Sequence, residues 1–293
     1  MRFLKDVKLY TDHEYFRKNF RWHGDTREPS ALKYHCFWKG IMSELPLISL
    51  KSLLISQSPP FEVWIWMTAE ELKANRTSID LFERVPNVRF REFSVEREVQ
   101  NTSLEKYAKL LKDGTSRNPT KQSNGLRMLA LSKYGGIYFD LDVLFLKDLR
   151  PLCNVEFCYQ WSNRPFANNA IMHAFKGSPD IRFLLERGLK INSLRPAKLF
   201  RFAELKGRLN QWVVFPSFLF DPVWICNDLR KKQNNYCNRV DDFFKKEIPI
   251  KLADFFPEAY AYHWHNRWKC PIRPNAIVGQ LSIEIIEKFQ KMF

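Results

Sequence analysis

The sequence predicts an α/β fold built on a mostly parallel sheet, and three observations support this prediction. Short apolar runs alternate with helical stretches along the chain, which is the pattern of βαβ units. The composition can fill a core, because 45% of the 293 residues are hydrophobic and 15% are aromatic. An apolar strand near the middle of the chain also runs directly into Asp140 and Asp142. Strand ends of this kind are where α/β sheets bind ligands.

The expected strands are apolar stretches bounded by Gly, Pro or polar residues, and they cover 34–38, 62–66, 88–93, 137–139, 143–146, 170–175 and 212–215. The expected helices carry apolar residues at helical spacing, and they cover 43–56, 69–74, 104–111, 126–134, 180–190, 199–209 and a terminal stretch around 281–289. Ser178-Pro179 signals a helix start, and Gly135-Gly136 signals a helix end. The polar stretches 97–122 and 227–239 are expected to be mainly loop.

The expected domain division is an N-terminal segment of helix and loop, residues 1–31, followed by a single domain over 32–293. Apolar residues near helical spacing between Phe3 and Tyr10 favour a helix on the core rather than on a membrane surface. No segment reaches the roughly 20 apolar residues of a membrane span, and the N-terminus lacks a signal-peptide pattern. A cytoplasmic location is therefore expected.

The charge of the chain favours an anionic partner. Its 47 basic and 32 acidic side chains leave a net charge of +15, which suits a nucleotide diphosphate, a nucleic acid or an anionic membrane surface. The basic residues are scattered, so a nucleic-acid-binding tail is not indicated. The six cysteines form no Cys-x-x-Cys pair, so we expect reduced, mostly buried thiols rather than a zinc site or a disulfide framework.

Asp140 and Asp142 need polar partners, because an unpaired buried charge is costly. Alternation along an extended segment would point both side chains to the same side. Carboxylate oxygens on one face suit Mg²⁺ or Mn²⁺, which complete their coordination with substrate phosphate and water. Taken alone, such a pair is more often a solvated turn, so its surroundings decide the interpretation.

Those surroundings resemble a known family. The resemblance rests on Ser123-Asn124-Gly125-Leu126-Arg127, then Leu131, then Tyr134-Gly135-Gly136-Ile137-Tyr138-Phe139-Asp140-Leu141-Asp142. They resemble the DXD-containing sugar-transferase family, which includes α-1,4-galactosyltransferases and yeast initiating α-mannosyltransferases. The family pattern is a helix carrying Asp and Arg, followed by Gly-Gly-x-Tyr-x-Asp-x-Asp. The first expected strand, 34–40, is similar to the family's opening strand, which lies near the nucleotide base.

The resemblance implies a GT-A fold, with a Rossmann-like nucleotide-sugar half over 32–147 and an acceptor half over 148–293. It also implies a UDP-sugar donor, a Mn²⁺ or Mg²⁺ ion and retention of configuration. Asp142 would coordinate the ion, Asp140 would contact the ribose or sugar and approach the ion, and Arg127 would face the donor sugar or a motif carboxylate. Asn124 departs from the family, which usually has Asp there, and this leaves the donor-sugar contacts and the donor identity open.

Residues 262–269 resemble the family's late histidine segment, in which a histidine completes the metal site. The resemblance favours His263 as the ligand, with His265 as the fallback, and both would point the same way in an extended segment. The remaining expected donor contacts are Tyr34, Trp38, Asn169 and Trp268. A turn explains Asn169 equally well, and core packing explains Trp268. Arg267 or Lys269 would neutralise a diphosphate or lie in solvent, and Asp221 would touch an acceptor or simply form a turn.

The expected function is therefore a metal-dependent glycosyltransferase with a glycan, glycolipid or protein acceptor. No nucleic-acid partner is expected, and a peripheral membrane contact stays open. Three other hypotheses remain: a nucleic-acid binder, a phosphohydrolase that uses the aspartate pair, and a non-catalytic sugar-nucleotide-binding relative. The first lacks a recognised motif and the second lacks dense Asp/His clusters, while Asn124 keeps the third open.

Overall fold

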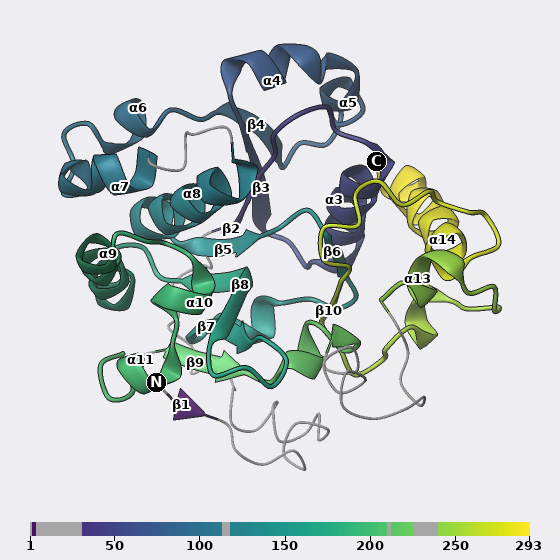
Figure 1. The fold of residues 1–293 in the computed structure, drawn as a ribbon. Helices are drawn as coiled ribbons and strands as arrows, with labels where there is room; N and C mark the ends of the chain where they lie inside the picture. Colours follow the sequence, from purple (N-terminus) through teal and green to yellow (C-terminus); the bar gives the residue numbers. More distant parts are fainter. Residues whose placement is uncertain (1, 4–30, 113–117, 210–211, 225–239) are drawn as a thin grey trace.

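The computed structural model describes residues 2–3, 31–112, 118–209, 212–224 and 240–293. Its centre is an eight-stranded sheet with the order β1-β9-β7-β8-β5-β2-β3-β4 (Figure 1). These strands are β1 (Arg2–Phe3), β2 (Leu32–Phe37), β3 (Phe61–Met67), β4 (Val88–Glu92), β5 (Gly136–Phe139), β7 (Glu156–Gln160), β8 (Ala167–Ala174) and β9 (Trp212–Phe215). Neighbouring strands are parallel except at β8, which runs antiparallel to β5 and β7. The predicted α/β fold class is confirmed.

Two further strands, β6 (Val143–Phe145) and β10 (Ala261–His263), form a separate antiparallel pair. The α-helices are α3 (Glu44–Ser56), α4 (Ala69–Ala74), α5 (Arg76–Asp80), α6 (Val95–Val99), α7 (Ala108–Lys112), α8 (Pro119–Tyr134), α9 (Pro179–Ile191), α10 (Pro196–Leu199), α11 (Phe202–Leu205), α13 (Asp242–Lys245) and α14 (Ile277–Met292). Short 3-10 turns cover Glu105–Tyr107, Arg150–Leu152, Ser217–Leu219 and Leu252–Asp254. In Figure 1, α8 and α9 lie on one side of the sheet, and α3 and α14 lie on the other.

The central strands are apolar throughout because both faces of the sheet are covered. In β3, Val63 and Ile65 pack into the core that includes α3. Trp64 and Trp66 point the other way, into the core formed with α8 and α9. A third cluster joins α3, α13 and α14 to the β6–β10 pair. This third cluster fixes the segment that carries the late histidines beside the end of the central sheet.

Three element predictions are wrong. The stretch 97–122 was expected to be mainly loop, but most of its described residues are helical, since it contains the end of α6, the turn Glu105–Tyr107, α7 and the start of α8. The single helix expected over 199–209 is instead the short helices α10 and α11, because Arg201 is extended and its backbone bridges Phe166. The prediction of an N-terminal helix is wrong at its first residues, because Arg2 and Phe3 form a strand beside β9. The rest of that expected helix lies outside the described residues, as does the expected loop over 227–239. Strand β7 was not predicted.

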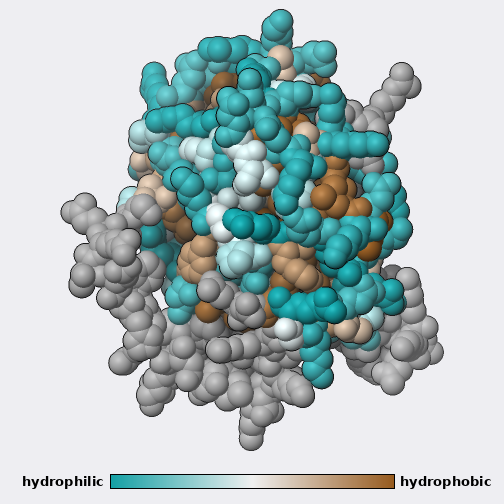
Figure 2. Space-filling model, turned by 90° about the vertical axis from the view of Figure 1, so that its left-hand side faces the viewer, coloured by the Kyte–Doolittle hydropathy of each residue, from teal (hydrophilic) through white to brown (hydrophobic). Residues whose placement is uncertain are grey.

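The four described cysteines are free thiols, as expected. Cys36, Cys153 and Cys158 are buried, and Cys270 is half-buried. Cys226 and Cys237 lie outside the described residues. No helix in the described part of the chain combines the length and the hydrophobicity needed to cross a bilayer. The face drawn in Figure 2 is largely hydrophilic, with hydrophobic side chains visible in smaller areas.

His173 in β8 is expected to make folding sensitive to acid. Burial lowers the pKa of His173 from 6.5 to about 4, although its bond to the Val155 carbonyl opposes that shift. The unfolded chain therefore binds a proton more readily than the native protein, so this stability is present above pH 6.5 and is lost as the pH falls towards 4. Between pH 7 and pH 5 we expect His173 to account for a loss of roughly 2 kcal/mol in unfolding free energy.

Urea unfolding at several pH values measures this effect. The variant His173→Gln should show a shallower decline between pH 7 and pH 5 than the wild type, whatever its absolute stability. An equally steep decline in both proteins would assign the acid sensitivity to other groups, such as His35, whose pKa burial lowers to about 3.

Candidate active site

The aspartate pair is placed by a helix, a two-glycine turn and a strand in direct succession. Helix α8 ends at Gly135, and β5 then carries the chain to Asp140 at its carboxyl end. The Asp140 amide still donates to the Ala170 carbonyl of β8 at 2.8 Å, after which Leu141 and Asp142 form a turn. The two side chains therefore reach one cavity across a turn, and the expected alternation along one continuous strand is wrong.

Asp142 is almost fully buried, with 2% of its surface exposed. Its Oδ2 accepts the Asn266 amide at 2.7 Å and lies 3.2 Å from His263 Nε2. Its Oδ1 is buried and has no hydrogen-bond partner among the described residues. Burial alone would raise the pKa of Asp142, but His263 and the Asn266 amide outweigh it and lower the pKa. Asp142 is therefore a charged, buried carboxylate, and one of its oxygens accepts no hydrogen bond from the described residues.

His263 reaches Asp142 because β10 pairs with β6, which sets His263 opposite Val143. The Trp264 amide donates to the Asp142 carbonyl at 3.0 Å and locks this register. His263 Nδ1 is hydrogen-bonded to the Tyr159 hydroxyl at 3.0 Å, which leaves Nε2 towards Asp142. Burial alone would lower the pKa of His263, but the Asp142 carboxylate raises it to about 9.

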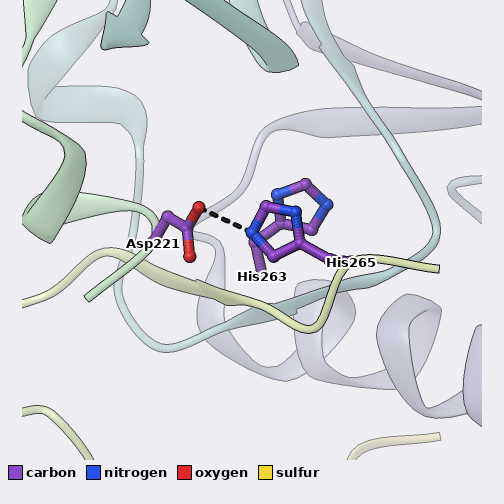
Figure 3. A group of neighbouring side chains, drawn as sticks. All are labelled: Asp221, His263 and His265. Carbon is purple, nitrogen blue, oxygen red and sulfur yellow. Dashed lines mark hydrogen bonds and ion pairs between the residues drawn. The ribbon is translucent and has the colours of Figure 1, made fainter. Parts of the chain in front are cut away.

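His265 lies over His263 with a ring-centroid separation of 3.8 Å, and its Nε2 is 2.7 Å from Asp221 Oδ2 (Figure 3). The chain turns sharply here, since His265 and Asn266 both adopt left-handed backbone angles, with φ of 49° and 57°. The structure thus brings both expected histidines to the site. Asp221 joins them from the segment that follows β9.

Arg127 holds Asp140 from the side of α8. The guanidinium is 2.9 Å from Asp140 Oδ1, lies over the Tyr138 ring and donates to the Asn169 carbonyl. Ser123 and Tyr138 hydroxyls lie 3.3 and 3.1 Å from the same carboxylate oxygen. Burial raises the pKa of Asp140, and the Arg127 charge opposes that rise without cancelling it.

The Asn124 side chain faces Asn169, whose Nδ2 donates to Asn124 Oδ1 at 3.3 Å. Both are buried, and both line the cavity together with Asn168. Asn168 and Asn169 belong to β8, so the turn explanation for Asn169 is wrong. Asn168 Nδ2 is buried without a hydrogen-bond partner in the described part of the chain.

These residues surround a cavity of about 750 Å³ at the carboxyl ends of the central strands. Trp38 and Trp268 meet edge to face at one part of its wall, with ring centroids 4.9 Å apart. Tyr34 is not brought to the cavity, because its ring lies in the core and its hydroxyl donates to Gln57. Arg267 does not line it either, and is paired with Asp241.

Several lining residues were not identified from sequence. Lys39, Lys121 and Arg195 supply positive charge, and Trp161 and Trp224 supply aromatic surface. They come from loops and helix ends that no local pattern marks as part of one site. Asp221 was noted in the sequence only as a turn residue or an acceptor contact.

The fold and the aspartate pair agree with comparison to known proteins. Residues 47–159 match the family model described as the glycosyltransferase sugar-binding region containing a DXD motif. This region contains α8, the two-glycine turn and both aspartates. The predicted resemblance to the DXD-class glycosyltransferases is therefore confirmed over residues 47–159.

Solved structures with a similar course include the PaToxG glycosyltransferase, with 17% identity, a TM-score of 0.49 and coverage of 69% of this chain and 81% of that chain. GlyE of Streptococcus pneumoniae has 12% identity and a TM-score of 0.46, and the match covers 89% of this chain and 60% of GlyE. The galactosyltransferase LgtC, in complex with donor and acceptor sugar analogues, has 12% identity, a TM-score of 0.43 and coverage of 89% and 96%. No curated protein matches the chain.

Removing Arg127 is expected to destabilise the fold. Arg127→Met leaves Asp140 without its cation, and breaking a buried ion pair costs about 3–5 kcal/mol. Because the Asp140 side chain is 27% exposed, we expect a smaller loss, about 2 kcal/mol in unfolding free energy. Adding Asp140→Asn should restore part of this loss, since the unpaired charge is then gone.

Urea denaturation of the single and double variants measures the effect. Arg76→Met is the control, because its ion pairs are exposed and should change stability by less than about 0.5 kcal/mol. Equal unfolding midpoints for Arg127→Met and Arg76→Met would show that the pair does not stabilise the protein.

Proposed function

We propose that the chain transfers a sugar from a UDP-sugar to an acceptor hydroxyl, that it needs a divalent ion, and that it retains the anomeric configuration. The observation that carries the proposal is Asp142. It is a buried carboxylate, set beside His263 in a cavity of about 750 Å³, and one of its oxygens has no hydrogen-bond partner among the described residues. A charge in that position requires a strong partner, and a cation supplies one.

The residues fit a divalent ion. Asp142 Oδ1 accepts no hydrogen bond from the described residues, and Tyr159 orients His263 through Nδ1. Orientation of a metal-binding imidazole through its other nitrogen is common in metal sites. A bound ion would neutralise the charge that develops on the departing diphosphate. Asp142 and His263 would hold it, with Asp140 close by.

The charge balance of the cavity favours an anionic donor. Lys39, Lys121 and Arg195 line it, and among the described residues Asp140 and Asp142 are its only acidic lining groups. Arg127 is already paired with Asp140, so its role is to hold that carboxylate towards the donor sugar. The three other cations suit the phosphates of a nucleotide sugar.

The two ends of the cavity suit the two ends of a donor. Trp38 and Lys39 follow β2, the strand that resembles the family's base-binding strand, so we place the uracil and ribose there against Trp268. Asn124, Asn168 and Asn169 lie on the other side of Asp140 and would receive the sugar hydroxyls. In this proposal most donor contacts come from residues 32–147, and Asn168, Asn169 and Trp268 add to them from 148–293, the part of the chain that also forms the acceptor side.

Retention would follow a front-face course. Apart from the aspartate pair, no carboxylate of the described residues lines the cavity, so a separate nucleophile for a covalent intermediate is lacking. The acceptor hydroxyl would then attack on the face from which the diphosphate leaves. The acceptor we propose is a glycan, on its own or linked to lipid or protein.

The test is to incubate the purified protein with a panel of UDP- and GDP-sugars, with Mn²⁺ or with EDTA, and to measure release of nucleoside diphosphate. We expect ion-dependent release from one UDP-sugar, and NMR of the product should show the anomeric configuration of the donor. Absence of release from every donor, together with absence of thermal stabilisation by nucleotide plus Mn²⁺, would favour the non-catalytic binding protein. An inverted product would refute the front-face course alone.

A further inference from the structure

A short stretch of the chain, residues 189–208, carries a dense positive charge. Its six basic side chains against one acidic side chain, Glu204, leave +5, which is a third of the net charge of +15. The stretch runs from the end of α9 through α10 and α11, which lie on the left-hand side of the molecule in Figure 1. We call the outer surface of this stretch the basic face. Its basic side chains are all exposed, and they are Lys190, Arg195, Lys198, Arg201, Lys206 and Arg208.

The basic face is held in place by contacts with α9. Arg187 of α9 donates to the backbone carbonyls of Lys198 and Leu199 at 3.1 and 3.2 Å and forms an ion pair with Glu204. Arg201 lies 3.5 Å from the same carboxylate. The one acidic group of the stretch is therefore already paired, and the remaining cations sit on a preformed surface.

Cations crowd one another on the basic face. Burial and the nearby charges of Arg201 and Arg208 lower the pKa of Arg187. Lys198, Lys206 and Arg208 take part in no ion pair within the described part of the chain. Because like charges repel, such a cluster costs stability that an anionic partner would restore.

We propose that the basic face docks on an anionic membrane surface. Lys and Arg side chains near anionic headgroups bind them electrostatically, and apolar side chains beside the cations strengthen the contact. Leu189 supplies such a side chain, because it is 39% exposed in the last turn of α9 and adjoins Lys190.

A membrane suits the basic face better than a nucleic acid does. Proteins that bind single strands stack bases on exposed aromatic rings, but in this stretch Phe200 is buried and Phe202 is half-buried. The stretch also contains no recognised nucleic-acid-binding motif.

The basic face adjoins the active-site cavity. Arg195, Pro196 and Ala197 line the cavity, and α10 packs against β8, the strand that carries Asn168 and Asn169. Docking would therefore place the cavity close to the membrane. The consequence for the acceptor rests on the proposed function: a glycan linked to a membrane lipid would reach the cavity from this side.

The test is co-sedimentation of the whole protein, without donor or acceptor, with vesicles of phosphatidylcholine alone or mixed with phosphatidylglycerol. We expect about tenfold or more tighter binding to the mixed vesicles, and loss of that preference as NaCl is added, because salt screens the attraction. The triple variant Lys198→Gln, Lys206→Gln and Arg208→Gln should bind the mixed vesicles about 100-fold less tightly, since each cation contributes about fivefold.

The matched control is the triple variant Lys73→Gln, Arg84→Gln and Arg89→Gln, which removes the same charge from exposed side chains in and around the edge strand β4. It should bind within about threefold of the wild type, because these cations are too far from the basic face to act through salt. Equal losses in the two triple variants would overturn the proposal, as would equal binding of the wild type to neutral and mixed vesicles.

A duplex oligonucleotide at the same phosphate concentration tests the other polyanion. Tighter binding to the duplex than to the mixed vesicles, lost only in the variant of the basic face, would assign this surface to nucleic acid and overturn membrane docking. Since neither donor nor acceptor is present, vesicle binding is measured independently of sugar transfer. A protein that docks but transfers no sugar would refute the proposed function alone.

Discussion

Asp142→Asn is expected to reduce ion-dependent release of nucleoside diphosphate by about 10³-fold or more. Asparagine keeps the shape of the side chain and can still accept the Asn266 amide through its oxygen. It removes the negative charge that the buried position offers to an ion, and it places an amide nitrogen where a ligand oxygen is needed. The effect should therefore appear in turnover and metal affinity, with little change in fold.

Steady-state kinetics with the donor identified by the panel measures this effect, with Mn²⁺ varied at each donor concentration. Asp254→Asn is the control for the loss of one acidic charge at a distance, and it should keep wild-type turnover. Thermal unfolding of both variants shows whether the fold is intact. Turnover of a folded Asp142→Asn protein within tenfold of the wild type would show that Asp142 does not bind a catalytic ion.

Gly136→Ala is expected to lower the unfolding free energy by about 4 kcal/mol. Gly136 has a φ of +99°, which a side chain tolerates poorly. A Cβ at this position would also overlap the backbone carbonyl of Lys33, because β5 runs directly beside β2. Backbone cannot move aside as a flexible side-chain end can, so strain and overlap add together.

Gly177→Ala separates the two causes. Gly177 also has a positive φ, +73°, but a Cβ there meets no atom within 4 Å. It should cost only the backbone strain, about 1–2 kcal/mol. Urea unfolding of both variants decides the matter, and equal losses would mean that β2 and β5 can separate enough to admit a methyl group.

The elements on either side of Gly136 could be predicted from the sequence because their signals are local. The helix α8, its glycine end, the apolar strand β5 and the aspartates follow one another within a short stretch of chain. Each signal depends on neighbours a few residues away: helical spacing, a glycine at the helix end, and apolar residues in a covered strand. The difference from the family at Asn124 was also visible, because Asn124 lies within the same short stretch of sequence.

The expected alternation of Asp140 and Asp142 failed because a turn replaces the strand at Leu141. Tyr34 was expected at the donor, but side chains alternate between the two faces of β2, and Tyr34 falls on the face that packs into the core with α3. In both cases the residue type was informative, but the direction of its side chain depended on the path of the chain through the sheet. Sequence periodicity does not report that path.

By itself, then, the sequence determined the α/β class, the DXD region and the candidacy of the late histidines. Only the tertiary structure decided that His263 lies against Asp142, through the β6–β10 pairing, and that Asp221 lies against His265. Asn266 and Asp142 are 124 residues apart in the chain and are joined by a 2.7 Å hydrogen bond. Contacts of this kind depend on the packing of whole elements and on the left-handed turn at His265. Local propensities end within a few residues, whereas a binding site is assembled by the register of strands and the shape of the core.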